Sequence, residues 1–332
     1  MQNTAESVPY EGLSPDTVLA AIESLGARCD GRLLALNSYE NRVYQIGCED
    51  APTLVAKFYR PGRWEDAAIL EEHAFALELA GHELPVVAPL VIHGHTLHHH
   101  AGYRFAVYPR MGGRMPDLDM HGHRLQMGRF LGRMHAVGRV RTFAHRPVLD
   151  VESYGRASLR TILERDELLP AHVAEAYRSV ASDALKRVDA AWARAEPLTR
   201  IRLHGDCHAG NVLWTESGPH FVDLDDTVMG PAVQDLWMLL AGDRAEMSVQ
   251  MAQVLEGYTA FCSFDGRELH LIEALRTLRM IHHSAWLARR WHDPAFPMAF
   301  PWFAETRYWE DQVLALREQT ALLEEGPLQV QW

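Results

Sequence analysis

Hydrophobic and polar positions follow one pattern in the first third of the chain and another in the rest. Apolar residues recur at helical spacing over residues 15–25, where Ser14 can cap the helix, Pro15 suits its first position and Gly26 follows its end. Short apolar runs separated by turn residues then predict strands at residues 32–36, 42–46 and 53–59, and two more strands that end at residues 105–108. A further helical pattern, at residues 64–79, is inserted among these strands.

Helical patterns dominate after Gly112 and Gly113. They cover residues 119–138, 171–195, 231–242, 247–263, 267–291 and 306–324, and one strand-rich stretch interrupts them at residues 201–223. The chain shows no internal repeat and no low-complexity linker. The pattern therefore predicts an α+β protein with a small β-rich N-terminal lobe, residues 1–110, and a larger, mostly helical C-terminal lobe, residues 111–332.

Composition narrows the class of partner. The 332 residues have a formal net charge of −12, and 48% of them are hydrophobic, as in ordinary globular proteins. The acidic balance argues against nonspecific binding to nucleic acid or to an anionic membrane, so we expect neither as a partner. Of the 32 basic residues only Lys57 and Lys186 are lysine, which matters for any mechanism that needs one.

The chain also lacks the usual signals for export. Its first residues have no basic region followed by an apolar core, and no run approaches the roughly 18 apolar residues of a spanning helix. The four cysteines are scattered, as expected of reduced cysteines rather than of a disulfide framework or a zinc site. We therefore expect a cytoplasmic protein, and we expect it to be a monomer.

The strand-rich stretch carries the polar residues best suited to catalysis. His204, Asp206 and Asn211 follow an apolar run with the spacing His-x-Asp-x-x-x-x-Asn of a kinase catalytic loop, and Asp223 ends a later apolar run. Phosphoryl transfer needs a carboxylate near the attacking hydroxyl, which suits Asp206. It also needs hard oxygen ligands for Mg²⁺, which suits Asn211 and Asp223.

The same reaction needs a fixed cation at the nucleotide phosphates. Lys57 lies in the apolar run Leu54-Val55-Ala56-Lys57-Phe58, which is comparable to the lysine-bearing strand of kinases. The helical pattern that follows carries Glu71 and Glu72. Glu72 is the better partner for Lys57, because it lies at the edge of the apolar face of that helix, and Glu71 remains an alternative.

These motifs resemble those of a known superfamily. The segment His204-Gly205-Asp206-Cys207-His208-Ala209-Gly210-Asn211 is similar to the H-G-D-x-H-x-x-N loop of the aminoglycoside phosphotransferase/choline kinase-like proteins, and Asp223 with Gly230-Pro231 and Asp235-Leu236 fits the block that follows it. More narrowly, residues 36–44, 57–61 and 234–240 closely resemble the bacterial stress response kinase A proteins of the RdoA/YihE type. The resemblance covers nearly the whole chain.

The resemblance implies a bilobal, protein kinase-like fold and a cytoplasmic enzyme that phosphorylates Ser and Thr residues of proteins. It implies ATP and Mg²⁺ as cofactors, with Asp206 as proton acceptor and Asn211 with Asp223 as metal ligands. It also implies that Ser38 lies against the ATP phosphates. No glycine occurs between Gly31 and Gly47 to form a glycine-rich loop, so the phosphate cover must use the turn Asn37–Asn41.

The acceptor remains open between two classes. Only six residues separate Asp223 from Gly230, which leaves no room for a long activation loop and favours a small-molecule kinase. The close family resemblance favours a protein Ser/Thr kinase instead, and this is the interpretation that we adopt.

Several other features have competing explanations. Asp223-Leu224-Asp225-Asp226-Thr227 matches the nucleophile motif of haloacid dehalogenase-like phosphatases, but no lysine follows Lys186 to hold the phosphate that such enzymes need. Asp225 is then an auxiliary metal ligand or a loop-bracing carboxylate. His208 could polarise the transferred phosphate or brace the loop. The five histidines within residues 93–100 favour a solvated hairpin turn over a metal site.

Overall fold

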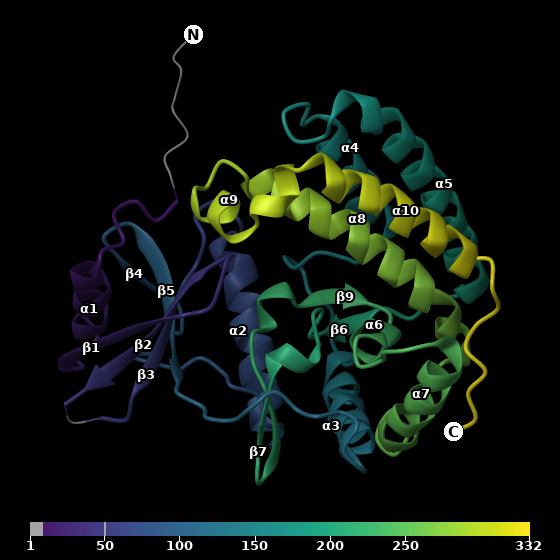
Figure 1. The fold of residues 1–332 in the computed structure, drawn as a ribbon. Helices are drawn as coiled ribbons and strands as arrows, with labels where there is room; N and C mark the ends of the chain where they lie inside the picture. Colours follow the sequence, from purple (N-terminus) through teal and green to yellow (C-terminus); the bar gives the residue numbers. More distant parts are fainter. Residues whose placement is uncertain (1–8, 50) are drawn as a thin grey trace. The chain divides into compact units, whose positions relative to one another are not determined.

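Residues 9–49 and 51–332, which the computed structural model describes, have the predicted α+β architecture (Figure 1). The chain folds as two units. Unit 1 contains the described residues up to Pro116 together with Gly210–Asp225, and unit 2 contains Asp117–Ala209 together with Asp226–Trp332. The sequence predicted a boundary near residue 110, whereas unit 1 continues to Pro116 and also includes a segment from the second half of the chain.

Unit 1 is built on a five-stranded antiparallel sheet of order β1-β2-β3-β5-β4. The strands are β1 (Cys29–Leu36), β2 (Arg42–Cys48), β3 (Leu54–Phe58), β4 (His98–His100) and β5 (Tyr103–Pro109). Helices α1 (Pro15–Glu23) and α2 (Asp66–Gly81) cover its two faces (Figure 1). Successive side chains of β3 alternate between them. Ala56 and Phe58 therefore pack with α1, and Lys57 points to the side of α2.

A hairpin explains why Gly210–Asp225 belongs to unit 1. Strands β7 (Val212–Thr215) and β8 (Gly218–Phe221) pair with each other and hydrogen-bond to the first half of the chain. The Phe221 amide donates to the Pro85 carbonyl at 2.7 Å, and Trp214 forms a bridge with Arg114. Such pairings between distant segments leave little trace in local sequence pattern.

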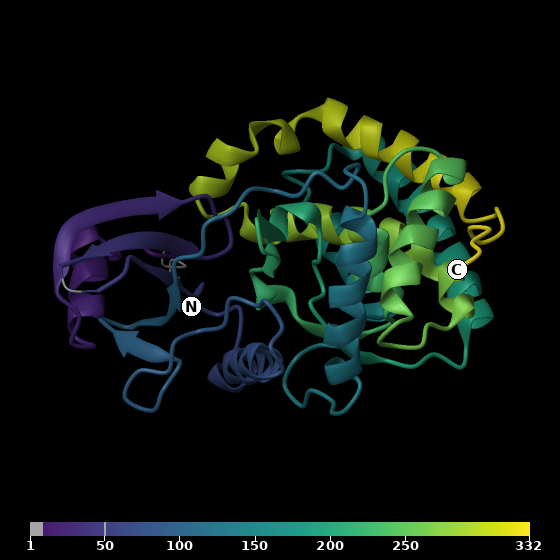
Figure 2. The same cartoon turned by 90° about the horizontal axis from the view of Figure 1, so that it is seen from below.

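Unit 2 is mostly helical, and its two short strands, β6 (Ile201–Leu203) and β9 (Val228–Gly230), pair antiparallel. Helix α10 packs along α5, and α3 packs against α7, as Figures 1 and 2 show. Glycines on α3 permit its close contact with α7, since a Cβ on Gly132 would lie 2.5 Å from the Tyr258 carbonyl oxygen. The helices are α3 (His123–Gly138), α4 (Ala157–Leu163), α5 (Ala171–Ala195), α6 (Val233–Trp237), α7 (Arg244–Tyr258), α8 (Ile272–Arg290), α9 (Ala295–Ala299) and α10 (Thr306–Leu322).

The histidine-rich segment is the expected solvated turn only in its first part, where Ile92 and His95 form an antiparallel bridge around the exposed His93 and Gly94. Its last three residues, His98–His100, form β4, one of the two edge strands of the sheet, and the His98 side chain is buried. A second turn, at Ala101 and Gly102, which both have positive φ, joins β4 to β5. Among the described residues, no group of three His, Cys, Asp or Glu side chains is placed to hold a metal ion.

A buried carboxyl at the start of α6 gives a pH-dependent prediction. Glu268 accepts a hydrogen bond from the Val233 amide at 2.9 Å, and burial raises its pKa to about 7. The folded protein therefore binds this proton more tightly than the unfolded chain, so the free energy of unfolding should fall as the pH rises from about 4.5 to about 7. We expect Glu268→Gln, which keeps the acceptor but not the charge, to remove about 2–3 kcal/mol of that fall.

Urea denaturation near pH 5 and near pH 8 measures this effect. Glu175→Gln is the matched control, because that side chain is 80% exposed and pairs at the surface with Arg178. An unchanged pH dependence in Glu268→Gln would remove Glu268 as its source.

Candidate functional site

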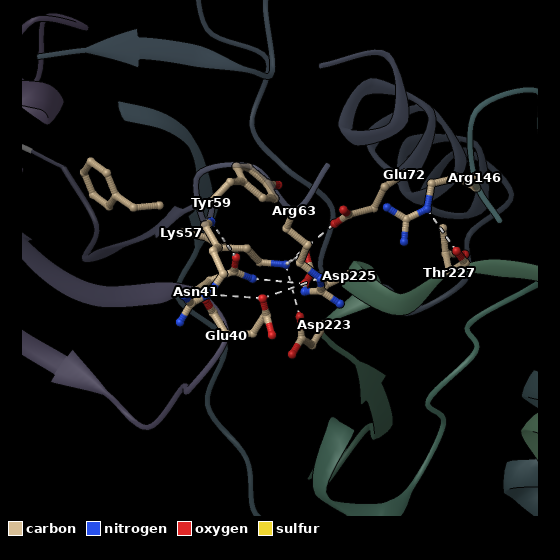
Figure 3. A network of polar contacts seen from close by, with 12 residues as sticks. Glu40, Asn41, Lys57, Tyr59, Arg63, Glu72, Arg146, Asp223, Asp225 and Thr227 are labelled. Carbon is tan, nitrogen blue, oxygen red and sulfur yellow. Dashed lines mark hydrogen bonds and ion pairs between the residues drawn. The ribbon is translucent and has the colours of Figure 1, made fainter. Parts of the chain in front are cut away.

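Lys57 is the centre of a charged cluster in unit 1 (Figure 3). Its Nζ lies 3.1 Å from Asp223 Oδ1, 3.6 Å from Glu72 Oε1 and 3.7 Å from Asp225 Oδ1. Burial alone would lower the pKa of Lys57, but the surrounding carboxylates outweigh it and raise that pKa well above its usual range. Lys57 is therefore a fixed cation at neutral pH. The expected pairing with Glu72 is present, and Glu72 is buried as its position on α2 predicts.

Aromatic rings and a neutral histidine surround the Lys57 side chain. Its Nζ lies 5.6 Å from the Tyr59 ring centroid and 5.7 Å from that of Tyr108. The Tyr59 hydroxyl lies 2.6 Å from His73 Nε2. Burial lowers the pKa of His73 to about 3, so this imidazole stays neutral and adds no charge that would repel Lys57. The surroundings hold the amine in place without neutralising it.

A second cation, Arg63, lies in the same cluster and was not expected from the sequence. Arg63 forms an ion pair with Asp225, and its Nε lies 3.7 Å from Glu40 Oε1 (Figure 3). Asn41 Nδ2 donates to Asp225 Oδ2 at 3.1 Å. The buried Asp225 thus joins the turn between β1 and β2 to the segment after β3, as a loop-bracing carboxylate would.

The hairpin β7–β8 brings the two expected metal ligands to one end of unit 1. Val212 pairs with Phe221, and one position further the Val222 amide donates to the Asn211 carbonyl at 3.0 Å. Asp223 follows directly, with a φ of 60° in the left-handed region that Asp tolerates better than most residues. Its carboxylate is 52% exposed and accessible to a ligand. Ser38 lies in the turn between β1 and β2 of the same unit.

Asp206 lies in unit 2, in the loop that follows β6. The preceding Gly205 has a φ of 87°, and a Cβ there would collide with the Asp226 carbonyl oxygen, so glycine is required. Asp206 Oδ1 lies 2.5 Å from Arg279 Nη1, and Oδ2 lies 3.5 Å from His208 Nε2. Burial alone would raise the pKa of Asp206, but hydrogen bonding to His208 and the Arg279 charge hold that pKa well below its usual range.

A buried carboxylate on α6 fixes the loop that carries Asp206. Asp235 Oδ2 accepts from the His204 amide at 2.9 Å, and Oδ1 accepts from the Gly205 amide at 2.8 Å. Asp235 Oδ2 also lies 3.0 Å from His135 Nε2, and both side chains are fully buried. Asp235 belongs to the Asp235-Leu236 motif of the sequence, whereas no sequence pattern marks His135.

The structure groups the predicted residues within each unit. Unit 1 contains Ser38, Lys57, Glu72, Asn211 and Asp223, and unit 2 contains Asp206 with Arg279 and His208. The chain passes from one unit to the other between Ala209 and Gly210 and back between Asp225 and Asp226. The catalytic-loop motif therefore supplies one group to each unit, Asp206 to unit 2 and Asn211 to unit 1.

The oxygen donors of unit 1 suit Mg²⁺. This ion is usually held by one or two carboxylates together with waters and substrate phosphates, rather than by a cage of protein ligands. The accessible carboxylate of Asp223 and the neighbouring Asn211 provide such a partial set.

As for membrane spans, no helix among the described residues is long and apolar enough to form one.

Comparison with protein families and curated sequences gives consistent results. The model of the "Phosphotransferase enzyme family" matches residues 32–272. "Stress response kinase A" of Escherichia coli strain K12 is 47% identical over 330 residues, which cover 99% of each chain. "Serine/threonine protein kinase RdoA" of Salmonella typhimurium strain LT2 is 46% identical over 321 residues, which cover 97% of each chain. None of these matches supports the phosphatase alternative.

Solved structures confirm the fold class. An amicoumacin kinase, hAmiN, in complex with AMP-PNP, Ca²⁺ and Ami superimposes with a TM-score of 0.70 at 19% identity, covering 94% of this chain and 95% of that one. A microcompartment-associated aminopropanol kinase gives a TM-score of 0.67 at 16% identity, covering 92% of this chain and 96% of that one. The architecture is that of kinase-like phosphotransferases.

Proposed function

The chain belongs to the phosphotransferase enzyme family, and from this we propose that it transfers the γ-phosphate of ATP to Ser and Thr hydroxyls of proteins. On this proposal it acts with Mg²⁺, as a monomer in the bacterial cytoplasm and in a stress response. The observation that carries the proposal is the Lys57–Glu72 ion pair beside Asp223. A buried lysine held by a helix carboxylate next to a strand-end aspartate is the arrangement that kinases use for nucleotide phosphates.

Each residue of unit 1 has a defined part in this proposal. Lys57 binds the nucleotide phosphates, and Glu72 orients Lys57. Asn211 and Asp223 hold Mg²⁺, which when bound neutralises charge that develops on the phosphates. Ser38 contributes a hydroxyl to the phosphates from the turn between β1 and β2. Lys57 remains charged throughout, because its surroundings raise its pKa.

Asp206 acts on the acceptor hydroxyl. Its low pKa makes it ionised at neutral pH but a weak base. Phosphoryl transfer passes through a loose transition state in which the attacking hydroxyl loses its proton late, so a weak base is sufficient. Asp206 therefore orients the hydroxyl through a hydrogen bond and accepts its proton as the new ester forms.

The proposal that the acceptor is a protein rests on the similar proteins described above. One of them, 46% identical over 97% of both chains, is named a serine/threonine protein kinase. The alternative is a small-molecule acceptor, which the short segment between Asp223 and Gly230 favours. Purified protein incubated with ATP, Mg²⁺ and a general protein acceptor, followed by phosphoamino acid analysis, tests the choice. Phosphoserine or phosphothreonine supports the proposal, and no phosphate on the acceptor protein opposes it.

Lys57→Met should lower kcat/KM by about 10²- to 10³-fold, the usual loss when one fixed charge-stabilising group is removed. The second lysine offers a matched control, since Lys186 is exposed on α5. We expect Lys186→Met to keep wild-type activity. Steady-state kinetics of both variants measure the difference, and equal activity in the two would exclude Lys57 from the phosphate site.

A further inference from the structure

The guanidinium of Arg279 is paired with the carboxylate of Asp206, which the proposed reaction uses. Arg279 lies on the exposed side of α8, with 47% of its side chain accessible, whereas Asp206 is 23% accessible. Among the described residues, Asp206 is the only carboxylate that pairs with Arg279. The guanidinium of Arg279 is therefore held on the carboxylate that the proposed function assigns to the acceptor hydroxyl.

The same face of α8 carries further positive and aromatic groups. Arg276, Arg279, His283, Trp286 and Arg290 recur at intervals of three or four, so they form one stripe along the helix. Most of the positions between them, including Leu278 and Ile281, are buried in unit 2. The stripe begins beside Trp237 and passes Asp206 through Arg279.

An aromatic surface continues the stripe away from Asp206. The Trp286 ring lies 5.6 Å from His283, 5.1 Å from Phe296 and 5.9 Å from Phe300, measured between ring centroids. Next to these rings Met298 is 83% exposed, and Trp302 is 39% exposed. Exposed apolar side chains beside a charged site are better suited to bind an extended polypeptide than a small polar molecule.

We propose that Arg279 determines acceptor specificity by binding an anionic group close to the phosphorylated Ser or Thr in a protein segment, and that the α8 stripe holds this segment. The inference rests on the proposed function. A cationic acceptor would be repelled by Arg279 and would find Asp206 already paired. An anionic group instead draws the guanidinium away from Asp206, which frees the carboxylate for the acceptor hydroxyl.

Matched peptides test this assignment. Each carries a single Ser, with Asp, phosphoserine that cannot accept further phosphate, Ala or Arg at a neighbouring position. The wild-type kcat/KM is expected to be about tenfold higher for the anionic peptides than for the Arg peptide, as one charge-assisted contact provides. Comparing kcat/KM for the Asp peptide with that for the phosphoserine peptide shows whether the bound anionic group is better provided by a carboxylate or by a phosphate.

Variants separate recognition from structure. Arg279→Gln should abolish the charge preference, and Arg279→Glu should reverse it in favour of the Arg peptide. Arg307→Gln is the matched control, because that arginine on α10 is 86% exposed and pairs only weakly with Asp311 at 3.7 Å. It should behave as wild type. Reversal cannot arise from a merely structural role, which would lower activity on all peptides alike.

The outcomes distinguish the two proposals. Equal wild-type activity on all four peptides, or an anionic preference that survives in Arg279→Glu, would overturn the role of Arg279 while protein phosphorylation stands. Phosphorylation of no peptide and no protein would overturn the proposed function and this inference with it. The wild-type comparison needs no variant, so it decides the question even if Arg279→Glu folds poorly.

Discussion

Replacing Asp206 by Asn should lower kcat by about 10²- to 10⁴-fold, the range expected when a positioned acid–base group is lost. The amide keeps the size of the side chain but cannot accept the proton or orient the hydroxyl through a negative charge. Nucleotide binding should be preserved, because Lys57 and Asp223 belong to unit 1 and Asp206 to unit 2.

Single-turnover transfer from ATP measures the loss, and a nucleotide-binding titration checks that the variant is intact. Asp311→Asn is the control, since its carboxylate is 64% exposed and lies on α10. Equal transfer by wild type and Asp206→Asn would remove Asp206 from the mechanism.

Replacing Asp235 by Ala should destabilise the protein by about 3–5 kcal/mol, because it leaves buried partners without their acceptor. The amides of His204 and Gly205 would lose their hydrogen bonds, and His135 would lose its only described carboxylate partner. The loop that carries Asp206 depends on these contacts, so activity should fall even at temperatures where the variant stays folded.

Denaturant unfolding gives the free energy, and transfer activity well below the melting temperature gives the effect on the loop. Asp189→Ala is the matched control, because that carboxylate pairs with Arg156 but is 43% exposed, where ion pairs contribute less than about 1 kcal/mol. A loss of similar size in both variants would contradict the bracing role of Asp235.

Local pattern predicted much of the fold. The apolar run around Lys57 was correctly predicted as a strand, and helical spacing selected Glu72 over Glu71 as the partner of Lys57. The long helices were expected at nearly their observed bounds; α5 was expected at residues 171–195 and spans Ala171–Ala195. These features depend on neighbours in sequence, and periodicity reports such neighbours directly.

What the sequence did not indicate depends on contacts between distant residues. Arg63 meets Asp225 across 162 positions, Arg279 meets Asp206 across 73, and His135 meets Asp235 across 100. An isolated arginine or histidine in a helical pattern carries no sign of its partner. Strand β9 has only three residues, too few for a periodic signal, and it exists because β6 pairs with it.

The acceptor class is the central claim, and one measurement tests it most directly. Cell extract is incubated with the purified protein, Mg²⁺ and γ-labelled ATP, and label is then measured separately in the protein and small-molecule fractions. We predict label on Ser and Thr of proteins with wild type and little above background with Asp206→Asn. Label that depends on Asp206 but appears only in the small-molecule fraction would contradict the account.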